Sequence, residues 1–162
     1  SNIDGMSKIN ILNDNVYIIQ NNNLSSISGL KNLNSVKEYF WISVNNSLTN
    51  VDGLNNLEAV GGVFKIDWNR SLTNIDGLSK LKTVKGGIEI VSNDMLENLN
   101  GLYNLMNFGR YMMILDNKSL RDLCGLNLCI SNNRLGGQIS IRNNYYNPEF
   151  YDIIKGDCSQ NK

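Results

Sequence analysis

Apolar residues recur along this chain with a period of 24 residues. Each unit begins with a leucine, and a glycine follows five positions later. The consensus unit reads L-T-N-I-D-G-L-x-x-L-x-x-V-x-G-G-I-x-I-x-x-N. Self-similarity at a fixed period of roughly 20–50 residues is the signature of a repeat architecture, so the period guides the choice of fold. The leading leucines are Leu24, Leu48, Leu72, Leu96 and Leu120, and the glycines are Gly29, Gly53, Gly77, Gly101 and Gly125.

The I-x-I segment near the end of each unit alternates apolar and polar residues. Such alternation indicates a short strand with one buried face, and no segment shows the sustained period of about 3.6 residues that a long helix requires. Strands of neighbouring units would pair in parallel, about 4.8 Å apart. We therefore expect one mainly β domain over residues 1–162, a solenoid of 24-residue repeats. Residues 1–23 would be a partial first repeat, 24–144 the repeats and 145–162 a C-terminal cap.

An asparagine closes the expected strand of every unit. A side-chain amide at a fixed corner can bond backbone groups of its own unit and of the next one. A ladder of such amides would satisfy turn backbone that is otherwise buried and unpaired. The ladder asparagines are Asn21, Asn45, Asn69, Asn93, Asn117 and Asn144. Because Asn144 comes three residues later than the period predicts, we expect a short insertion around residues 127–135.

The outward positions of the strands are the first candidates for a binding surface. They lie one step before and one step after the inner apolar residue. Exposed aromatic and charged side chains on a flat sheet suit a peptide or a sugar ring. The candidate binding residues are Tyr17, Trp41, Lys65, Asp67, Trp68, Glu89, Met113 and Leu115. The alternative is that these are ordinary strand formers, or that other domains of a longer protein cover them.

The fifth unit is apolar on both faces of its strand, because Tyr111, Met113 and Leu115 accompany the inner Met112 and Ile114. An apolar outward face of this kind suits contact with a partner, with the cap or with a second copy of the chain. A homodimer through the fifth unit is therefore one expectation.

The composition argues against several classes of function. The 15 basic and 15 acidic side chains give a net charge of zero, so nucleic acid is not an expected partner. No apolar run approaches the roughly 20 residues of a membrane span, so we expect no insertion into a membrane. With no histidine and three cysteines, neither a metal site nor a cofactor is expected. Asp67 and Glu89 could form a catalytic carboxylate pair, but Lys65 beside them favours an ordinary ion pair.

The unit L-T-x-I-x-G-L-x-x-L…G-x-I-x-I-x-x-N resembles that of the receptor L domain, and the similarity is closer to bacterial cell-surface versions. The C-terminal segments L-C-G-L at 123–126 and N-N-Y-Y-N-P-E-F-Y-D-I-I-K-G-D-C at 143–158 look like that group too. The resemblance covers essentially the whole chain. It implies a right-handed, single-stranded β-helix, an extracellular or cell-surface location and a non-catalytic role, although a fold does not determine a function.

The C-terminal residues are expected to cap the apolar end of the solenoid with one short helix. Asn147 is a suitable N-cap, Pro148 would occupy the first helical position and Gly156 would end the helix. Three apolar side chains of this helix would then face the last repeat. They are Phe150, Ile153 and Ile154.

Three cysteines lie in the C-terminal part of the chain. We expect a disulfide between Cys124 and Cys158 that joins the cap to the last repeat and leaves Cys129 as a buried free thiol. Closing a loop of this size contributes about 3–4 kcal/mol in the chain-entropy model. The alternative pairs Cys124 with Cys129 and leaves Cys158 free.

These features favour a non-enzymatic recognition or adhesion module at a cell surface. Its partner would be a protein or a carbohydrate that binds the outward strand face. The first alternative is a structural spacer whose repeats supply only length and stiffness. A carbohydrate-active enzyme is less favoured, because the clustered carboxylates of such enzymes have no clear counterpart beyond Asp67 and Glu89.

Overall fold

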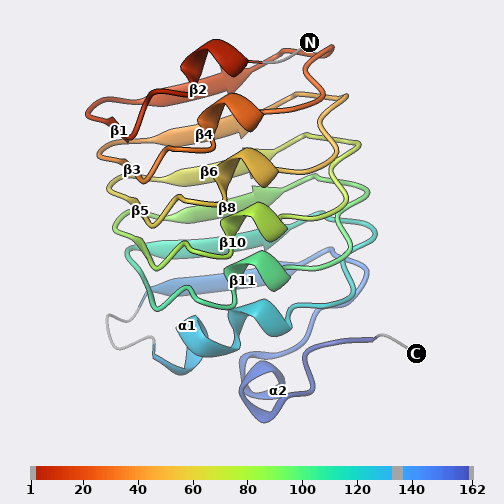
Figure 1. Cartoon of the computed structure of the whole chain (residues 1–162). Coiled ribbons are helices and arrows are strands. Elements are labelled where there is room, and N and C mark those ends of the chain that lie inside the picture. Colours follow the sequence, from red (N-terminus) through yellow and green to blue (C-terminus); the bar gives the residue numbers. More distant parts are fainter. Residues whose placement is uncertain (1–2, 133–136, 161–162) are drawn as a thin grey trace.

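The chain winds through a stack of similar coils, which Figure 1 shows from the side. The computed structural model describes residues 3–132 and 137–160. In each of the first five coils, a single turn of 3₁₀-helix is followed by a short strand and then a longer strand, whereas the last coil has no short strand among its described residues. The short strands form one parallel sheet and the long strands form another. We call one such turn of the chain around the stack a coil.

The two sheets contain five and six strands. The five-stranded sheet comprises β1 (Ile11–Leu12), β3 (Ser35–Val36), β5 (Ala59–Val60), β7 (Thr83–Val84) and β9 (Asn107–Phe108). The six-stranded sheet comprises β2 (Val16–Ile19), β4 (Phe40–Ser43), β6 (Phe64–Asp67), β8 (Ile88–Val91), β10 (Tyr111–Leu115) and β11 (Gln138–Arg142). Neighbouring strands pair with an offset of 24 residues, as in Phe40 opposite Phe64.

The last pair of long strands departs from this offset. Tyr111 of β10 pairs with Gln138 of β11, and the ladder asparagines at this step lie 27 residues apart. The expected three-residue insertion is therefore present between η6 (Cys124–Leu126) and β11. The insertion was expected around residues 127–135, and residues 133–135 of this range lie outside the described residues.

Single-turn 3₁₀-helices form another side of the stack (Figure 1). They are η1 (Asp4–Met6), η2 (Ser28–Leu30), η3 (Asp52–Leu54), η4 (Asp76–Leu78), η5 (Asn100–Leu102) and η6. The recurrent glycine lies in the middle of each turn. A Cβ atom on Gly53 would lie 1.9 Å from the carbonyl oxygen of Ile27 in the preceding coil. Glycine is required here because neighbouring coils approach too closely for any side chain.

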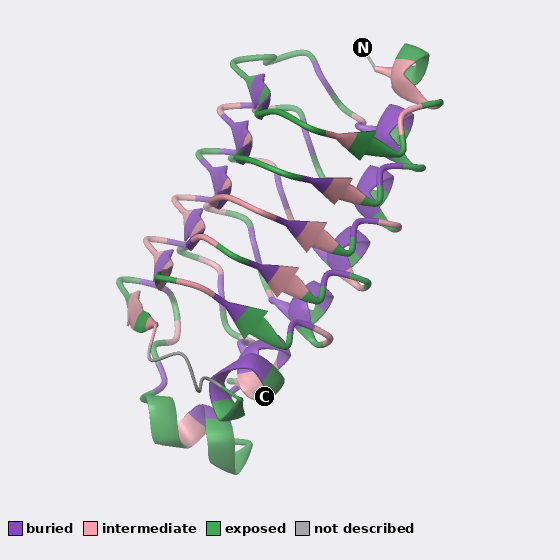
Figure 2. Ribbon diagram, turned by 90° about the vertical axis from the view of Figure 1, so that its left-hand side faces the viewer, coloured by how far each residue is buried: buried purple, intermediate pink, exposed green. Residues whose placement is uncertain are grey.

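The leading leucines and the inner strand residues fill the inside of the coils. Leu48, Leu72 and Ile66 have no exposed surface, and Figure 2 shows buried positions lining the interior of the stack. Phe40 and Phe64 pack with their ring centroids 5.5 Å apart. Burying such apolar area stabilises the fold by roughly 25 cal/mol per Å². The 24-residue period thus becomes one continuous core.

The expected fold class is wrong. We expected a right-handed, single-stranded β-helix with one capping helix, whereas the strands form two separate parallel sheets accompanied by short helices. The unforeseen sheet arises at positions such as Val36 and Val60, where one buried valine completes a strand of only two residues. A single apolar residue has no periodicity, so the sequence pattern could not indicate this strand.

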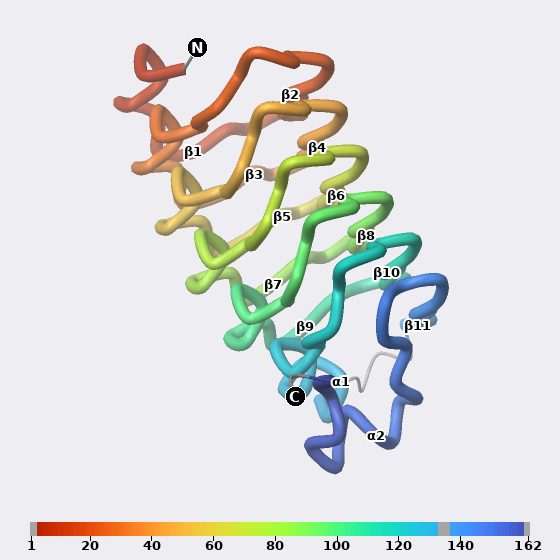
Figure 3. Tube along the Cα trace, turned by 90° about the vertical axis from the view of Figure 1, so that its right-hand side faces the viewer, coloured from red at the N-terminus to blue at the C-terminus, as the bar shows by residue number. Residues whose placement is uncertain are grey.

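Each long strand is followed by a residue with a positive φ, and the stacked corners recur through the coils (Figure 3). These residues are Gln20, Val44, Trp68, Ser92, Asp116 and Asn143, with φ between 55° and 59°. The left-handed conformation costs a non-glycine residue roughly 1–2 kcal/mol. The packing of the coils therefore imposes this bend, even on the β-branched Val44.

The ladder asparagines lie just after these corners and link one coil to the next. The backbone N–H of Asn45 donates to Oδ1 of Asn69 over 3.0 Å, and Nδ2 of Asn45 donates to the carbonyl of Ile18 over 2.8 Å. The same pattern continues through Asn93, Asn117 and Asn144. The amides thereby satisfy backbone groups that the corner would otherwise leave buried and unpaired.

Two α-helices, α1 (Asn127–Ser131) and α2 (Phe150–Lys155), close the C-terminal end of the stack (Figure 1). Nδ2 of Asn127 donates to the carbonyl of Ile153 over 2.8 Å and joins the two helices. Cys129, Ile130 and Ile153 are buried against the core. The cap therefore consists of two helices rather than the single one that was expected.

The start of α2 also differs from the expectation. Its N-cap is Glu149, which forms a capping box with Asp152. Asn147 instead accepts hydrogen bonds from the N–H and Nδ2 of Asn144 and so ends the asparagine ladder. Gly156 ends the helix in the left-handed conformation, as expected. Of the three apolar side chains expected on the core, only Ile153 is buried, while Phe150 and Ile154 are exposed.

The expected disulfide between Cys124 and Cys158 is confirmed, with the two Cα atoms 4.9 Å apart. It ties η6 to the residues that follow α2. Cys129 is a buried free cysteine, and burial raises the pKa of its thiol to about 12. Disulfides persist in oxidising compartments, so the Cys124–Cys158 bridge indicates an oxidising environment for this protein.

Candidate functional site

The outward face of the six-stranded sheet carries most of the candidate binding residues. Tyr17, Trp41, Lys65, Glu89 and Met113 stand opposite one another on successive strands from β2 to β10. Parallel pairing places such residues about 4.8 Å apart along the stack. The sheet therefore gathers into one row side chains that are far apart in the sequence. We call this row the strand face.

Trp41 is the centre of an aromatic cluster on the strand face. Its ring centroid lies 5.1 Å from that of Tyr17 in an edge-on arrangement and 6.1 Å from that of Tyr39. Nζ of Lys65 lies 5.7 Å from the centroid of the Trp41 ring, within reach of a cation–π interaction. Nε1 of Trp41 is buried and has no hydrogen-bond partner among the described residues. Such a donor is uncommon in a folded protein and calls for an explanation.

Charged side chains form a network beside Trp41. Nζ of Lys65 lies 3.2 Å from Oδ2 of Asp67 and 3.3 Å from Oε2 of Glu89. The hydroxyl of Ser43 donates to Oδ1 of Asp67, and the phenol of Tyr111 donates to Oε1 of Glu89 over 2.5 Å. The expected ion pair is therefore present. Asp67 and Glu89 do not face each other across the sheet, because Asp67 pairs with Val91 and Glu89 pairs with Lys65.

The protonation states of this network follow from its contacts. Partial burial alone would lower the pKa of Lys65, but Asp67 and Glu89 outweigh it and hold that pKa above its ordinary value. Partial burial and the hydrogen bond to Glu89 raise the pKa of Tyr111 to about 12. Lys65 is thus a stable cation and both carboxylates are engaged. Neither carboxylate is an isolated group of the kind that serves as a general acid.

The stability of the protein should fall at alkaline pH through Tyr111. Its pKa is raised from 10.0 to about 12, so its contribution is complete below pH 10 and is lost as the pH rises through about 12. We expect the Tyr111→Phe variant to lose less stability than the wild type over that interval. Urea unfolding at pH 8 and at about pH 11.5 measures this difference. The exposed Tyr103, changed to phenylalanine, is the control, and equal losses in the wild type and Tyr111→Phe would contradict the assignment.

The remaining candidate residues lie at the margins of the strand face. Trp68 follows β6 at a positive-φ corner and is 47 % exposed. Asp67 was expected on the outward face, yet it is only 8 % exposed, because Ser43 and Lys65 cover it. Met113 and Leu115 of β10 are half-buried. The homodimer through this fifth coil stays a prediction.

Sequence reasoning missed Tyr39 and placed Tyr111 only in the apolar fifth unit, although both tyrosines contribute to the site. Tyr39 contacts Trp41, and Tyr111 binds Glu89 and lies against the backbone of Gly87. Tyr39 directly precedes β4, and Tyr111 is the first residue of β10. Both occupy the same place in their units, directly before the position of Phe40 and Phe64, which pair with an offset of 24 residues. Aligning the units at this place would have placed both tyrosines at one corner of the stack.

Neither a metal site nor a membrane span is apparent in residues 3–132 and 137–160. Within these ranges no group of three or more Cys, Asp or Glu side chains is placed to hold a metal ion. No helix there has the length and apolar character needed to cross a membrane. The chain matches no protein-family model, and comparisons with curated proteins and with solved structures found no match. The function must therefore be inferred from the site itself.

Proposed function

We propose that this protein is a non-enzymatic recognition module that binds a protein or carbohydrate ligand at a cell surface through the strand face. The observation that carries the proposal is the environment of Trp41. Its ring is half-buried between Tyr17 and Lys65, and its buried Nε1 has no acceptor among the described residues. Aromatic residues of this kind dominate the energetics of many binding surfaces.

The rigidity of the strand face supports a binding role. In the six-stranded sheet, β4, β6, β8 and β10 are each paired on both sides, and the asparagine ladder fixes the corners beyond the strands. A surface held in this way loses little conformational freedom when a ligand binds. The row of Tyr17, Trp41 and Lys65 is thereby preorganised as a continuous contact surface.

The contacts of the carboxylates support a non-catalytic role. Asp67 is bonded by Ser43 and Lys65, and Glu89 is bonded by Lys65 and Tyr111. Acid–base catalysis by a carboxylate pair needs one group that is protonated near neutral pH and one that is free to act. In this network both groups are instead occupied by hydrogen bonds and ion pairs. A carbohydrate-active enzyme is therefore the less favoured function.

The cell-surface location is part of the same proposal. The disulfide between Cys124 and Cys158 favours an oxidising compartment. The resemblance of the sequence units to receptor L domains adds a prediction of surface exposure. A signal sequence or a surface anchor in the full-length gene product would support this location.

The decisive experiment compares ligand binding by the wild type with that by a strand-face variant. We expect the wild type to bind at least one ligand on a combined glycan and protein array, and the Tyr17→Ala/Trp41→Ala double variant to bind it about tenfold or more weakly. The matched control is Tyr103→Ala/Met106→Ala, which removes exposed side chains outside the strand face. Circular dichroism of all variants checks that they are folded.

Two results would overturn the proposal. Equal binding by the wild type and the strand-face variant would remove the strand face from recognition. Cleavage of a polysaccharide that disappears in the Asp67→Asn variant would instead identify an enzyme.

The structural spacer is the second candidate, because the asparagine ladder and the paired sheets join the coils into a stiff unit. A spacer role predicts that the strand-face variant leaves every binding property of the full-length protein unchanged. The array experiment with full-length protein therefore separates the two functions.

A further inference from the structure

A hollow lies at the corner of the stack where the short strands lead into the long strands. The corner residues of four successive coils are 37–39, 61–63, 85–87 and 109–111, which read KEY, GGV, KGG and GRY. The first and last of these corners carry large side chains, whereas the two between them carry mostly glycine. A depression bounded by the outer two corners follows from this pattern, and we call it the corner notch.

The corner notch has the dimensions of a small ligand site. It encloses about 320 Å³ and is lined by Tyr39 and Tyr111 at its two ends, with Gly62 and Gly86 between them. Three steps of about 4.8 Å separate the outer corners, or roughly 14 Å between their backbones. The volume falls at the lower end of the range of about 300–1,000 Å³ for ligand pockets. One or two rings of a larger ligand would fill it.

The close approach of the coils keeps the floor of the notch free of side chains. A Cβ atom on Gly62 would lie 2.8 Å from the carbonyl carbon of Glu38, and one on Gly86 would lie 2.5 Å from that of Gly62. At Gly87 a Cβ atom would lie 2.4 Å from Cζ of Tyr111, so the phenol ring rests directly on this glycine. The notch is thus maintained by backbone packing.

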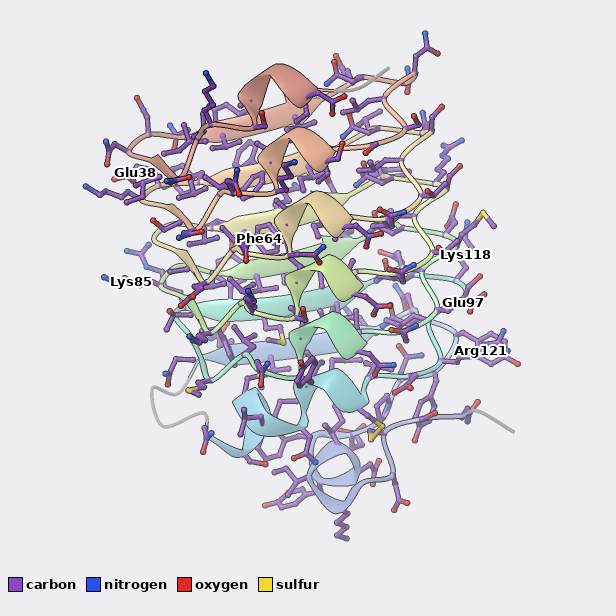
Figure 4. All side chains as sticks on the ribbon, viewed as in Figure 1. Glu38, Phe64, Lys85, Glu97, Lys118 and Arg121 are labelled. Carbon is purple, nitrogen blue, oxygen red and sulfur yellow. A yellow bond between two sulfur atoms is a disulfide. The ribbon has the colours of Figure 1, made fainter. Side chains whose placement is uncertain are left out.

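The rim of the notch is positively charged. Lys85 and Arg110 are exposed and line it, and Glu38 is the only acidic residue of the notch lining in the described structure. Figure 4 shows Glu38 and Lys85 at the same edge of the stack. Neither Lys85 nor Arg110 belongs to the ion pairs of the described residues, which use Lys65, Lys82 and Lys118. Both cations are therefore available to an anionic ligand.

We propose that the corner notch binds a carboxylate-bearing saccharide, with a sugar ring between Tyr39 and Tyr111 and its carboxylate on Lys85 and Arg110. This inference rests on the proposed recognition function and names its ligand class. Tyrosine rings stack on the C–H face of a sugar, and Arg–carboxylate contacts are strong and directional. Tyr39 also packs against Trp41, so the notch is continuous with the strand face.

The backbone of the notch favours a saccharide over a peptide. Peptides that add to a sheet use free backbone N–H and C=O groups. Here the N–H of Gly62 donates to the carbonyl of Glu38 over 3.0 Å, and the N–H of Gly86 donates to that of Gly62 over 3.1 Å. These amides are occupied, whereas the carbonyl oxygens of Glu38 and Gly62 each keep a second lone pair that a sugar hydroxyl can use.

Isothermal titration with a tetrasaccharide of alternating glucuronate and N-acetylglucosamine tests the proposal, with its methyl-esterified form as the matched neutral probe. We expect the wild type to bind the acidic form about tenfold or more tightly than the ester, and more weakly as salt is raised. The Lys85→Gln/Arg110→Gln variant should lose that preference, and Tyr39→Ala should weaken binding of both forms. The control Lys8→Gln/Lys31→Gln removes two exposed cations outside the notch lining and should bind as the wild type does.

The outcomes separate this proposal from the broader one. Equal binding of the acid and the ester, or no binding of either by the wild type, would overturn the acidic-saccharide assignment. A protein ligand that is lost in Tyr17→Ala/Trp41→Ala but retained in Lys85→Gln/Arg110→Gln would also overturn it, while leaving the recognition function intact. Conversely, acidic-saccharide binding that needs Lys85 and Arg110 but not Trp41 would support the notch as the binding site. It would also show that the strand face does not take part in recognition.

Discussion

Removing the disulfide between Cys124 and Cys158 should lower the free energy of unfolding by about 3–4 kcal/mol. The two cysteines are 34 residues apart in the sequence, and the bridge holds the segment after α2 against η6. Without it, the unfolded chain gains the conformational freedom of this loop. Urea unfolding of the Cys124→Ser/Cys158→Ser variant measures the loss.

A reducing agent provides the matched control for this effect. Reduction should destabilise the wild type by a similar amount and leave the double variant unchanged. Because Cys129 is buried and burial raises its pKa, it should not react with thiol reagents in the folded wild type. If the variant unfolds at the same urea concentration as the oxidised wild type, the bridge does not stabilise the cap.

Replacing Asn69 by alanine should destabilise the protein by about 3–5 kcal/mol. Oδ1 of Asn69 accepts the N–H of Asn45, and its Nδ2 donates to the carbonyls of Ile42 and Asp67 over 2.8 and 3.1 Å. Asn69 is fully buried, so water cannot replace these bonds in the folded state. Several backbone groups of the corner would therefore be left unpaired together.

The exposed Asn55 is a suitable control, because it ends η3 through its backbone N–H alone. Asn55→Ala should change the free energy of unfolding by less than about 0.5 kcal/mol. Thermal and urea unfolding of the two variants give the comparison. A loss below about 1 kcal/mol for Asn69→Ala would show that the corner finds other hydrogen-bond partners.

The parts of the fold that the sequence predicts are those that recur once in every unit. The offset of 24 residues places Phe40 opposite Phe64 and makes Asn45 reach Asn69. The last ladder asparagine comes later in the sequence than the period requires, and this predicts the longer offset at Asn144. Each of these expectations uses only spacing, which the stacking of coils preserves.

The expectations that failed depend on contacts that spacing does not encode. The second sheet consists of strands of two residues. A strand such as Ala59–Val60 buries a single side chain. The start of α2 was misplaced because the Glu149–Asp152 capping box outcompetes Asn147, which serves the ladder instead. Asp67 is covered by neighbours on its own and adjacent strands, although alternation alone placed it outward.

The candidate site was only partly visible for a related reason. Trp41 and Lys65 stand out as outward residues of predicted strands. Tyr39 directly precedes β4 and Tyr111 is the first residue of β10, so alternation along a strand does not single out either one. Their importance comes from the glycines between them, since the absence of side chains at Gly61, Gly62 and Gly86 creates the corner notch.

The asparagine ladder also gives the stack an electrical direction. In each buried link the Oδ1 of the later asparagine accepts the backbone N–H of the earlier one, as between Asn69 and Asn45, so the side-chain carbonyls of the ladder all point toward the preceding coil. Dipoles aligned in this way add, much as peptide dipoles add along a helix. The end near Asn21 is therefore the negative pole and the end near Asn144 the positive pole. Asn147, whose oxygen accepts the last two bonds, terminates the series at the pole where an electron-rich group is most strongly stabilised.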